Sequence, residues 1–195
     1  MKLTGTEDLR VQKTISAIHT AFEQMILEMD YPEMTVKELC ERAKINKKTF
    51  YRYYPTMDDL LLEVQMEISS EYIDMISHYH LPEELDKVNE AFFRYSIGKG
   101  EMYEKITCAS GYLTIRDRII GRVNAATWQK SAWFNNIPEW QQHILIVFVQ
   151  YTIVEIYKQW VKDGKKTSVE EVIELSNQLI CKGFNPLAPV WGWRS

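Results

Sequence analysis

The segment 35–62 constrains the fold most, because it holds start and stop signals for two short helices. Thr35-Val36-Lys37-Glu38 reads as a capping box, in which a hydroxyl and a carboxylate satisfy each other's free backbone N–H groups. Apolar residues then recur at helical spacing until Lys44-Ile45-Asn46 interrupts them. Asn46 is a good N-cap for a second helix, and Pro55 must end that helix. This order of signals predicts a helix-turn-helix.

The second of these helices is basic. The stretch 42–54 contains no acidic residue, in a chain whose net charge is -4. Its cations are Arg42, Lys44, Lys47, Lys48 and Arg52. Tyrosine and phenylalanine side chains alternate with them. Cations of this kind neutralise phosphates, and aromatic and short polar side chains fit against sugars and base edges. The stretch therefore predicts a polyanion partner that is bound at one small surface.

A spaced set of residues runs through the same segment: Thr35-Val36, Leu39, Ala43, Ile45, Thr49-Phe50-Tyr51-x-Tyr53-Tyr54 and Leu60-Leu61. In this pattern, over about residues 10–62, the chain resembles the N-terminal domain of the tetracycline-repressor-like (TetR) transcriptional regulators. The rest of the chain matches that family only in its helical layout. Lys44 stands where a turn glycine is common, and Cys40 replaces a common alanine. Met57 replaces a lysine that typically contacts phosphate, and Lys44 is positioned to compensate.

The resemblance implies which residues contact double-stranded DNA. Major-groove contacts are expected from Lys47, Lys48, Tyr51 and Arg52. Contacts to phosphate or sugar are expected from Thr35, Lys44, Thr49 and Tyr53. Phe50 and Tyr54 share the inner face of the same helix, so we expect them to pack on the first helix of the domain.

Composition and periodicity predict an all-α chain. Glycine and proline are few, and no strict alternation of apolar and polar residues is long enough to predict a sheet. We expect a three-helix DNA-binding domain over 1–55 and a helical effector-binding and dimerisation domain over 56–195. A helix from about 58 to 80 links the two. The further predicted helices span 83–97, 101–109, 112–134, 139–162 and 168–182, and the 185–195 tail has no periodicity.

The second domain carries two functional expectations. Its aromatic residues are more typical of a packed core than of a pocket for a small apolar or aromatic effector, and the resemblance brings these two interpretations near even. The candidate lining residues are Phe92, Phe93, Tyr112, Trp128 and Phe148. Helices 139–162 and 168–182 are joined by a short turn, and the first is apolar nearly all round. We therefore expect both to pair with their copies in a homodimer.

Other classes of function have weaker support. No catalytic constellation, metal-ligand set or cofactor motif appears, and His78-x-His80 does not place both rings on one helical face. The apolar stretch 144–154 is too short to span a bilayer, residues 1–10 are not a signal peptide, and three cysteines form no CxxC pair, which together favour the cytoplasm. The prediction is a ligand-responsive repressor, not an enzyme. The alternatives are a TetR-like regulator controlled by a partner protein, and a helical enzyme or carrier with an inert head.

Overall fold

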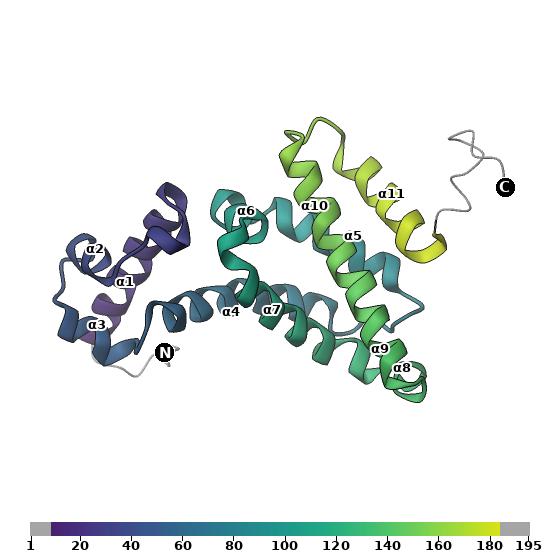
Figure 1. Cartoon of the computed structure of the whole chain (residues 1–195), viewed down its shortest axis with the longest axis horizontal. Helices are drawn as coiled ribbons and strands as arrows, with labels where there is room; N and C mark the ends of the chain where they lie inside the picture. The colour runs from purple at the N-terminus through teal and green to yellow at the C-terminus, as the bar shows by residue number, and fades with distance from the viewer. Residues whose placement is uncertain (1–8, 184–195) are drawn as a thin grey trace. The chain divides into compact units, whose positions relative to one another are not determined.

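Helices account for every regular element of residues 9–183, the part of the chain that the computed structural model describes, apart from the side chains of 113–115. The prediction of an all-α fold is therefore confirmed (Figure 1). The α-helices are α1 Leu9–Glu28, α2 Val36–Arg42, α3 Lys47–Tyr53, α4 Met57–Ile76, α5 Leu85–Ile97, α6 Gly100–Cys108, α7 Leu113–Ala126, α8 Ala132–Asn136, α9 Glu139–Ile146, α10 Thr152–Lys162 and α11 Val169–Lys182. Our predictions for the first residues and for the 185–195 tail lie outside the described range.

The helices pack as two compact units. Unit 1 contains the described residues up to Ser70 together with Lys99–Ile119, and unit 2 contains Glu71–Gly98 and the described residues from Ile120 onward. Helix α4 passes from unit 1 to unit 2 at Ser70. The N-terminal packing unit is thus larger than the 1–55 domain that we expect to bind DNA, because most of α4 (residues 57–70) and all of α6 pack with α1–α3. The functional division at residue 55 stays a prediction.

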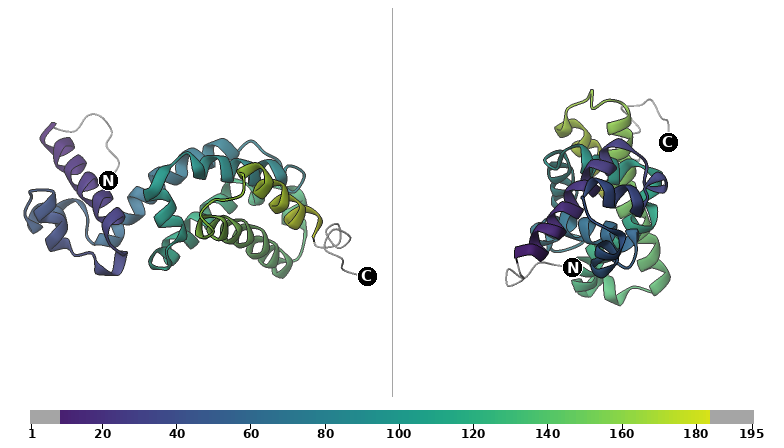
Figure 2. Two further views of the ribbon diagram at one scale, coloured as in Figure 1. Left: turned by 90° about the horizontal axis from the view of Figure 1, so that it is seen from above. Right: turned by 90° about the vertical axis from the view of Figure 1, so that its left-hand side faces the viewer.

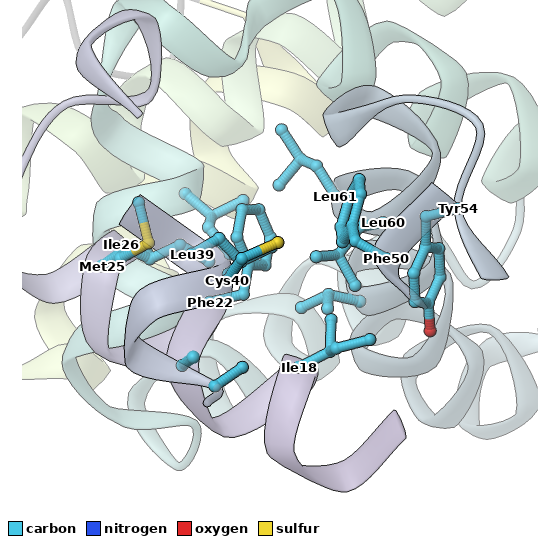
Figure 3. Packing of buried hydrophobic residues seen from close by; sticks show 14 of the residues in the cluster. Ile18, Phe22, Met25, Ile26, Leu39, Cys40, Phe50, Tyr54, Leu60 and Leu61 are labelled. Carbon is cyan, nitrogen blue, oxygen red and sulfur yellow. The ribbon is translucent and has the colours of Figure 1, made fainter. Parts of the chain in front are cut away.

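The core of unit 1 draws on α1, α2, α3, α4 and α6 (Figure 3). Helix α1 supplies an apolar stripe from Ile18 to Ile26, which follows the spacing read from the sequence. Phe50 and Tyr54 from the α3 segment are buried in the same cluster, as predicted. Helix α6 adds Ile106. Because both inner aromatics of α3 are anchored, the opposite face of this short helix is held toward solvent.

The segment 112–134 differs from the single long helix that we predicted. Helix α7 ends at Ala126, a 3-10 turn follows over Trp128–Lys130, and α8 begins at Ala132. Thr127 leaves the helical conformation and its hydroxyl donates to Val123 O at 2.8 Å. Trp128 and Phe134 are buried and their ring centroids lie 5.2 Å apart. The break therefore allows two large aromatic side chains to be buried in the interior. This burial depends on tertiary packing, which the helical periodicity of the sequence does not show.

Residues 139–162 form one continuous helix of 24 residues, in which a π-helical stretch over Val147–Tyr151 separates α9 from α10. The helix is long and apolar enough to cross a bilayer by length and composition alone, and about a third of its most apolar window is buried. The helix is thus longer than the apolar stretch 144–154 on which we based the expectation that no segment spans a bilayer. One face of this helix is exposed in the single chain: Trp140 by 62%, Ile144 by 58% and Val147 by 57%.

The C-terminal hairpin completes unit 2. Helices α10 and α11 lie side by side (Figures 1 and 2), and α11 packs chiefly against α5. A capping box begins α11, since the Ser168 hydroxyl accepts from Glu171 N–H and the Glu171 carboxylate accepts from Ser168 N–H. Gly183 follows the last turn with φ of 71°, as expected of a glycine after a helix.

Candidate nucleic-acid interface

The first helix of the motif, α2, begins as predicted but uses only half of the expected capping box. The Thr35 hydroxyl accepts from Glu38 N–H at 3.2 Å. The Glu38 carboxylate instead accepts from Arg42 Nη2 at 2.7 Å, and Arg42 Nη1 donates to Glu28 on α1 at 2.7 Å. Arg42 therefore ties α2 to α1. We expected it to add to the basic surface, but two carboxylates already neutralise its charge.

The turn between α2 and α3 contains Lys44, which stands where the family pattern commonly has a glycine. Lys44 has φ of 54°, in the left-handed region that glycine adopts most easily. Ile45 N–H donates to Cys40 O at 3.0 Å and closes the turn. The backbone thus keeps the conformation of a turn glycine and places an exposed lysine there. An added cation at this point is consistent with its expected phosphate contact.

Helix α3 begins at the predicted cap. The Asn46 side chain Oδ1 accepts from Thr49 N–H at 2.8 Å and from the Thr49 hydroxyl at 3.1 Å. Thr49 is half-buried and its hydroxyl proton is committed to Asn46, so this hydroxyl is left as an acceptor for water or a base edge. Tyr54 caps the other end through its N–H to Phe50 O at 3.0 Å.

The outward face of α3 carries the predicted DNA contacts. Lys47, Lys48 and Arg52 are exposed, and Tyr51 is exposed by 53%. The Arg52 guanidinium lies 5.9 Å from the centre of the Tyr53 ring, and this ring also packs partly against the core. The structure therefore brings cations and aromatic rings together on one short exposed face. Thr35 and Lys44 are exposed just before it on the chain.

The start of α4 follows this face. Thr56 and Asp59 cap each other, since Thr56 N–H donates to Asp59 Oδ2 at 2.9 Å and Asp59 N–H donates to Thr56 Oγ1 at 3.1 Å. Met57 packs against the core of unit 1. A methionine at this position therefore supports the α3–α4 junction in place of the phosphate contact that a lysine would supply.

The structure also shows a contact that sequence reasoning missed. His19 on α1 places Nε2 2.9 Å from the Tyr54 hydroxyl, which follows directly on α3. The helical spacing of His19 could have indicated this contact. His19 lies four residues after Ile15 and one turn before the next apolar residues of α1, so it lies beside the apolar face of that helix. A histidine beside such a stripe faces the partner helices, but its partner was 35 residues away in sequence.

The five candidate ligand residues do not meet at one described site. Tyr112 lies in the core of unit 1. Phe92 and Phe93 pack against Tyr157 in unit 2, and Trp128 packs against Phe134. Phe148 is exposed on the apolar face of the 139–162 helix. A cavity of about 610 Å³ lies between α5 and α11, but residues such as Glu90, Arg94 and Asn177 line it and none of the five does.

Comparison with known proteins places the fold and the motif. Residues 18–64 match the family model described as bacterial regulatory proteins, tetR family. A TetR transcriptional regulator from Streptococcus agalactiae 2603V is 19% identical, with a TM-score of 0.66 over 88% of this chain and 95% of that one. The fatty acid degradation regulator FadR from Bacillus halodurans is 16% identical, with a TM-score of 0.60 over 92% and 98%.

FadR from Bacillus subtilis, in complex with stearoyl-CoA, is 18% identical, with a TM-score of 0.58 over 86% of this chain and 98% of that one. No curated protein matches the chain significantly by sequence. Residues 18–64 contain all of α2 and α3, the second half of α1 and the first turns of α4, so the family match includes the exposed basic helix. The chain therefore carries a tetR-family region at residues 18–64, and its described residues have the all-α fold of these regulators.

Proposed function

We propose that the protein is a sequence-specific, ligand-responsive repressor that inserts α3 into the major groove of an operator. One observation carries the proposal: α3 buries Phe50 and Tyr54 and turns Lys47, Tyr51 and Arg52 to solvent. Lysine and arginine side chains on a major-groove helix contact guanine acceptors and phosphates. Thr35, Lys44, Thr49 and Tyr53 are assigned to the sugar–phosphate backbone at the edges of the same surface.

The proposed assembly is a homodimer, which two-fold related operator half-sites require. Its support is the exposed face of the 139–162 helix, where Trp140, Ile144, Val147 and Phe148 recur at helical spacing. A continuous apolar face of this kind is typical of an interface between protein copies. In the proposed dimer, this face and the exposed side of α11 meet the same helices of a second copy. In such a dimer, the second copy and not lipid would cover the apolar face of the 139–162 helix. The proposed protein is therefore cytoplasmic, although this helix is long enough to span a bilayer.

The proposed effector is a small, largely apolar molecule bound in the C-terminal domain. Gln150 lies in the π-helical stretch of the 139–162 helix and is 8% exposed. Neither of its amide atoms has a hydrogen-bond partner among the described residues. Buried amides are normally paired, and π-helical stretches are frequent at functional sites. The FadR neighbour from Bacillus subtilis, whose structure contains stearoyl-CoA, supports an effector with a long apolar part, because the acyl chain of that molecule is apolar.

In the proposed mechanism, effector binding changes the course of α4, which belongs to unit 1 up to Ser70 and to unit 2 beyond it. The two α3 helices of the dimer then no longer fit successive major grooves, and the operator is released. Linkage requires that operator DNA weaken effector binding by the same factor.

The decisive experiment begins with selection of bound duplexes from a random-sequence library by the purified protein. Titrations then compare the selected operator with a scrambled duplex at several salt concentrations. Lys47→Ala and Tyr51→Ala should each lower operator affinity by about 1–3 kcal/mol and relax the preference at particular base pairs, because each variant removes a side chain that reads a base edge.

Lys130→Ala is the matched control, because Lys130 is an exposed lysine of the 3-10 turn before α8 and belongs neither to α3 nor to the 139–162 helix. This variant should bind the operator with wild-type affinity. Wild-type affinity in both Lys47→Ala and Tyr51→Ala would show that α3 is not the recognition helix.

A further inference from the structure

One hydroxyl connects three helices of unit 1. Tyr54, at the end of α3, is 1% exposed, and its Oη lies 2.9 Å from His19 Nε2 on α1 and 3.4 Å from Glu63 Oε1 on α4. The rings of Tyr54 and Phe50 are also in contact, with centroids 5.8 Å apart. The position of this hydroxyl therefore fixes the C-terminal end of α3 relative to both neighbouring helices.

The chemistry of the partners sets the direction of these hydrogen bonds. An ionised carboxylate only accepts, so the Tyr54 hydroxyl donates to Glu63 and must accept from His19. This requires the proton of neutral His19 to be on Nε2. Burial raises the pKa of Tyr54 to about 12, with a smaller contribution from the Glu67 carboxylate, so the hydroxyl keeps its proton at neutral pH.

Carboxylates surround the same imidazole. Glu67 Oε2 on α4 lies 3.8 Å from His19 Nδ1, and Glu63 Oε1 lies 3.9 Å from Nε2. Glu23, one turn further along α1, adds a third negative charge. Among the described residues, these carboxylates and Tyr54, which follows α3, are the titratable groups that face the ring from α1, α3 and α4. Nε2 thus lies between the Tyr54 hydroxyl and the Glu63 carboxylate, and Nδ1 faces the Glu67 carboxylate.

We propose that neutral His19 positions the recognition helix by donating from Nε2–H to the Tyr54 hydroxyl, and that protonation at Nδ1 releases this hold. Hydrogen bonds from a charged donor to a carboxylate are about twice as strong as neutral ones. The imidazolium therefore turns its two N–H groups toward Glu63 and Glu67, and Tyr54 loses its donor. Operator affinity then falls in mild acid.

The pH range follows from the burial of the ring. Burial lowers the pKa of His19 below 6.5, and this outweighs the opposing effect of Glu67 and Glu23. Because the pKa is lowered in the folded protein, the neutral contact is complete above pH 6.5 and is lost as the pH falls through the lowered value. The hold on α3 is therefore intact at neutral pH.

The inference rests on the proposed role of α3 and is tested by operator titrations of four variants at pH 7.5 and 5.5. His19→Leu and Tyr54→Phe should each weaken operator binding at pH 7.5 by about fivefold, the value of one hydrogen bond. The double variant should be no weaker than the weaker single one, because both remove the same bond. His19→Gln retains an N–H donor without a titratable ring and should keep most of the affinity.

The ratio of wild-type to His19→Gln affinity should fall between pH 7.5 and 5.5, which a purely structural role would not produce. Unfolding midpoints of all variants establish that each is folded, and His19→Gln keeps the test valid if His19→Leu is not. A ratio that does not change with pH, or a Tyr54→Phe variant that binds like wild type, would overturn the inference. If Lys47→Ala also binds like wild type, then the proposed recognition helix itself is wrong.

Discussion

Helix α3 and the 139–162 helix both expose aromatic side chains, but the neighbours of those side chains differ. On α3, Tyr51 lies among Lys47, Lys48 and Arg52. On the 139–162 helix, Trp140 lies with Ile144 and other apolar residues. Cations beside an aromatic ring favour a polyanion as the partner, because they neutralise its phosphates and release its bound counterions. Binding through an apolar face is favourable because it removes apolar surface from water. Aromatic content alone thus does not identify a partner, whereas the charge of the surrounding residues does.

The largest expected effect separates two adjacent residues of α3. Phe50→Ala should lower the free energy of unfolding by about 3–5 kcal/mol, because Phe50 is fully buried in the core of unit 1. Tyr51→Ala should change it by less than about 0.5 kcal/mol, since that side chain is exposed. Chemical unfolding followed by circular dichroism measures both. Equal unfolding midpoints for the two variants would show that α3 is not anchored through its inner face.

The next effect concerns the apolar face. Ile144→Glu should weaken dimerisation by about 2–4 kcal/mol, because it places a charge at the centre of the proposed interface. Sedimentation at micromolar concentration should show a dimer for the wild type and a monomer for the variant. Glu139→Gln changes an exposed charge on the same helix and should leave the dimer intact.

Salt sharpens the comparison between the two surfaces. Dimerisation through an apolar face should change little with salt, whereas operator affinity should fall steeply. A monomeric wild type, or a dimer that Ile144→Glu does not weaken, would contradict the proposed interface.

The sequence was most informative where the structure depends on local contacts. The Asn46 cap, the stop at Pro55 and the α1 stripe each involve residues within a few positions of one another, and the predicted helix-turn-helix is present. The features that we missed join distant residues. Arg42 reaches Glu28 on another helix, and the Thr127 break serves to bury Trp128. No helical period encodes such contacts, because they depend on how the helices pack.

The candidate site shows the same limit. The identities of the exposed residues on α3 followed from one helical period, once Phe50 and Tyr54 were assigned to the inner face. The ligand residues could not be assigned in this way. Phe92 is buried against Tyr157, whereas Phe148 is exposed, although the sequence placed both as aromatic residues on predicted helices. Which aromatic residue is buried in the core depends on neighbours that are remote in sequence.

The smallest expected effect tests how far the basic surface extends beyond α3. Lys44 occupies the left-handed region, which costs an ordinary L-residue about 1–2 kcal/mol. Lys44→Gly removes this cost but adds freedom to the unfolded chain, so the stability should rise by at most about 1 kcal/mol. The same change removes a cation. The log–log slope of operator affinity against salt should therefore become shallower by about 0.9 for each protomer whose Lys44 contacts a phosphate.

Lys44→Arg is the matched control, since it keeps both the charge and the backbone cost while changing the shape of the cation. Salt titrations of the two variants and the wild type separate charge from backbone effects. If Lys44 contacts a phosphate, the arginine variant keeps the wild-type slope and the glycine variant does not. Equal slopes for all three proteins would mean that Lys44 contacts no phosphate. The DNA-binding surface would then end at the N-terminus of α3, and the turn lysine would not replace the phosphate contact that is absent at Met57.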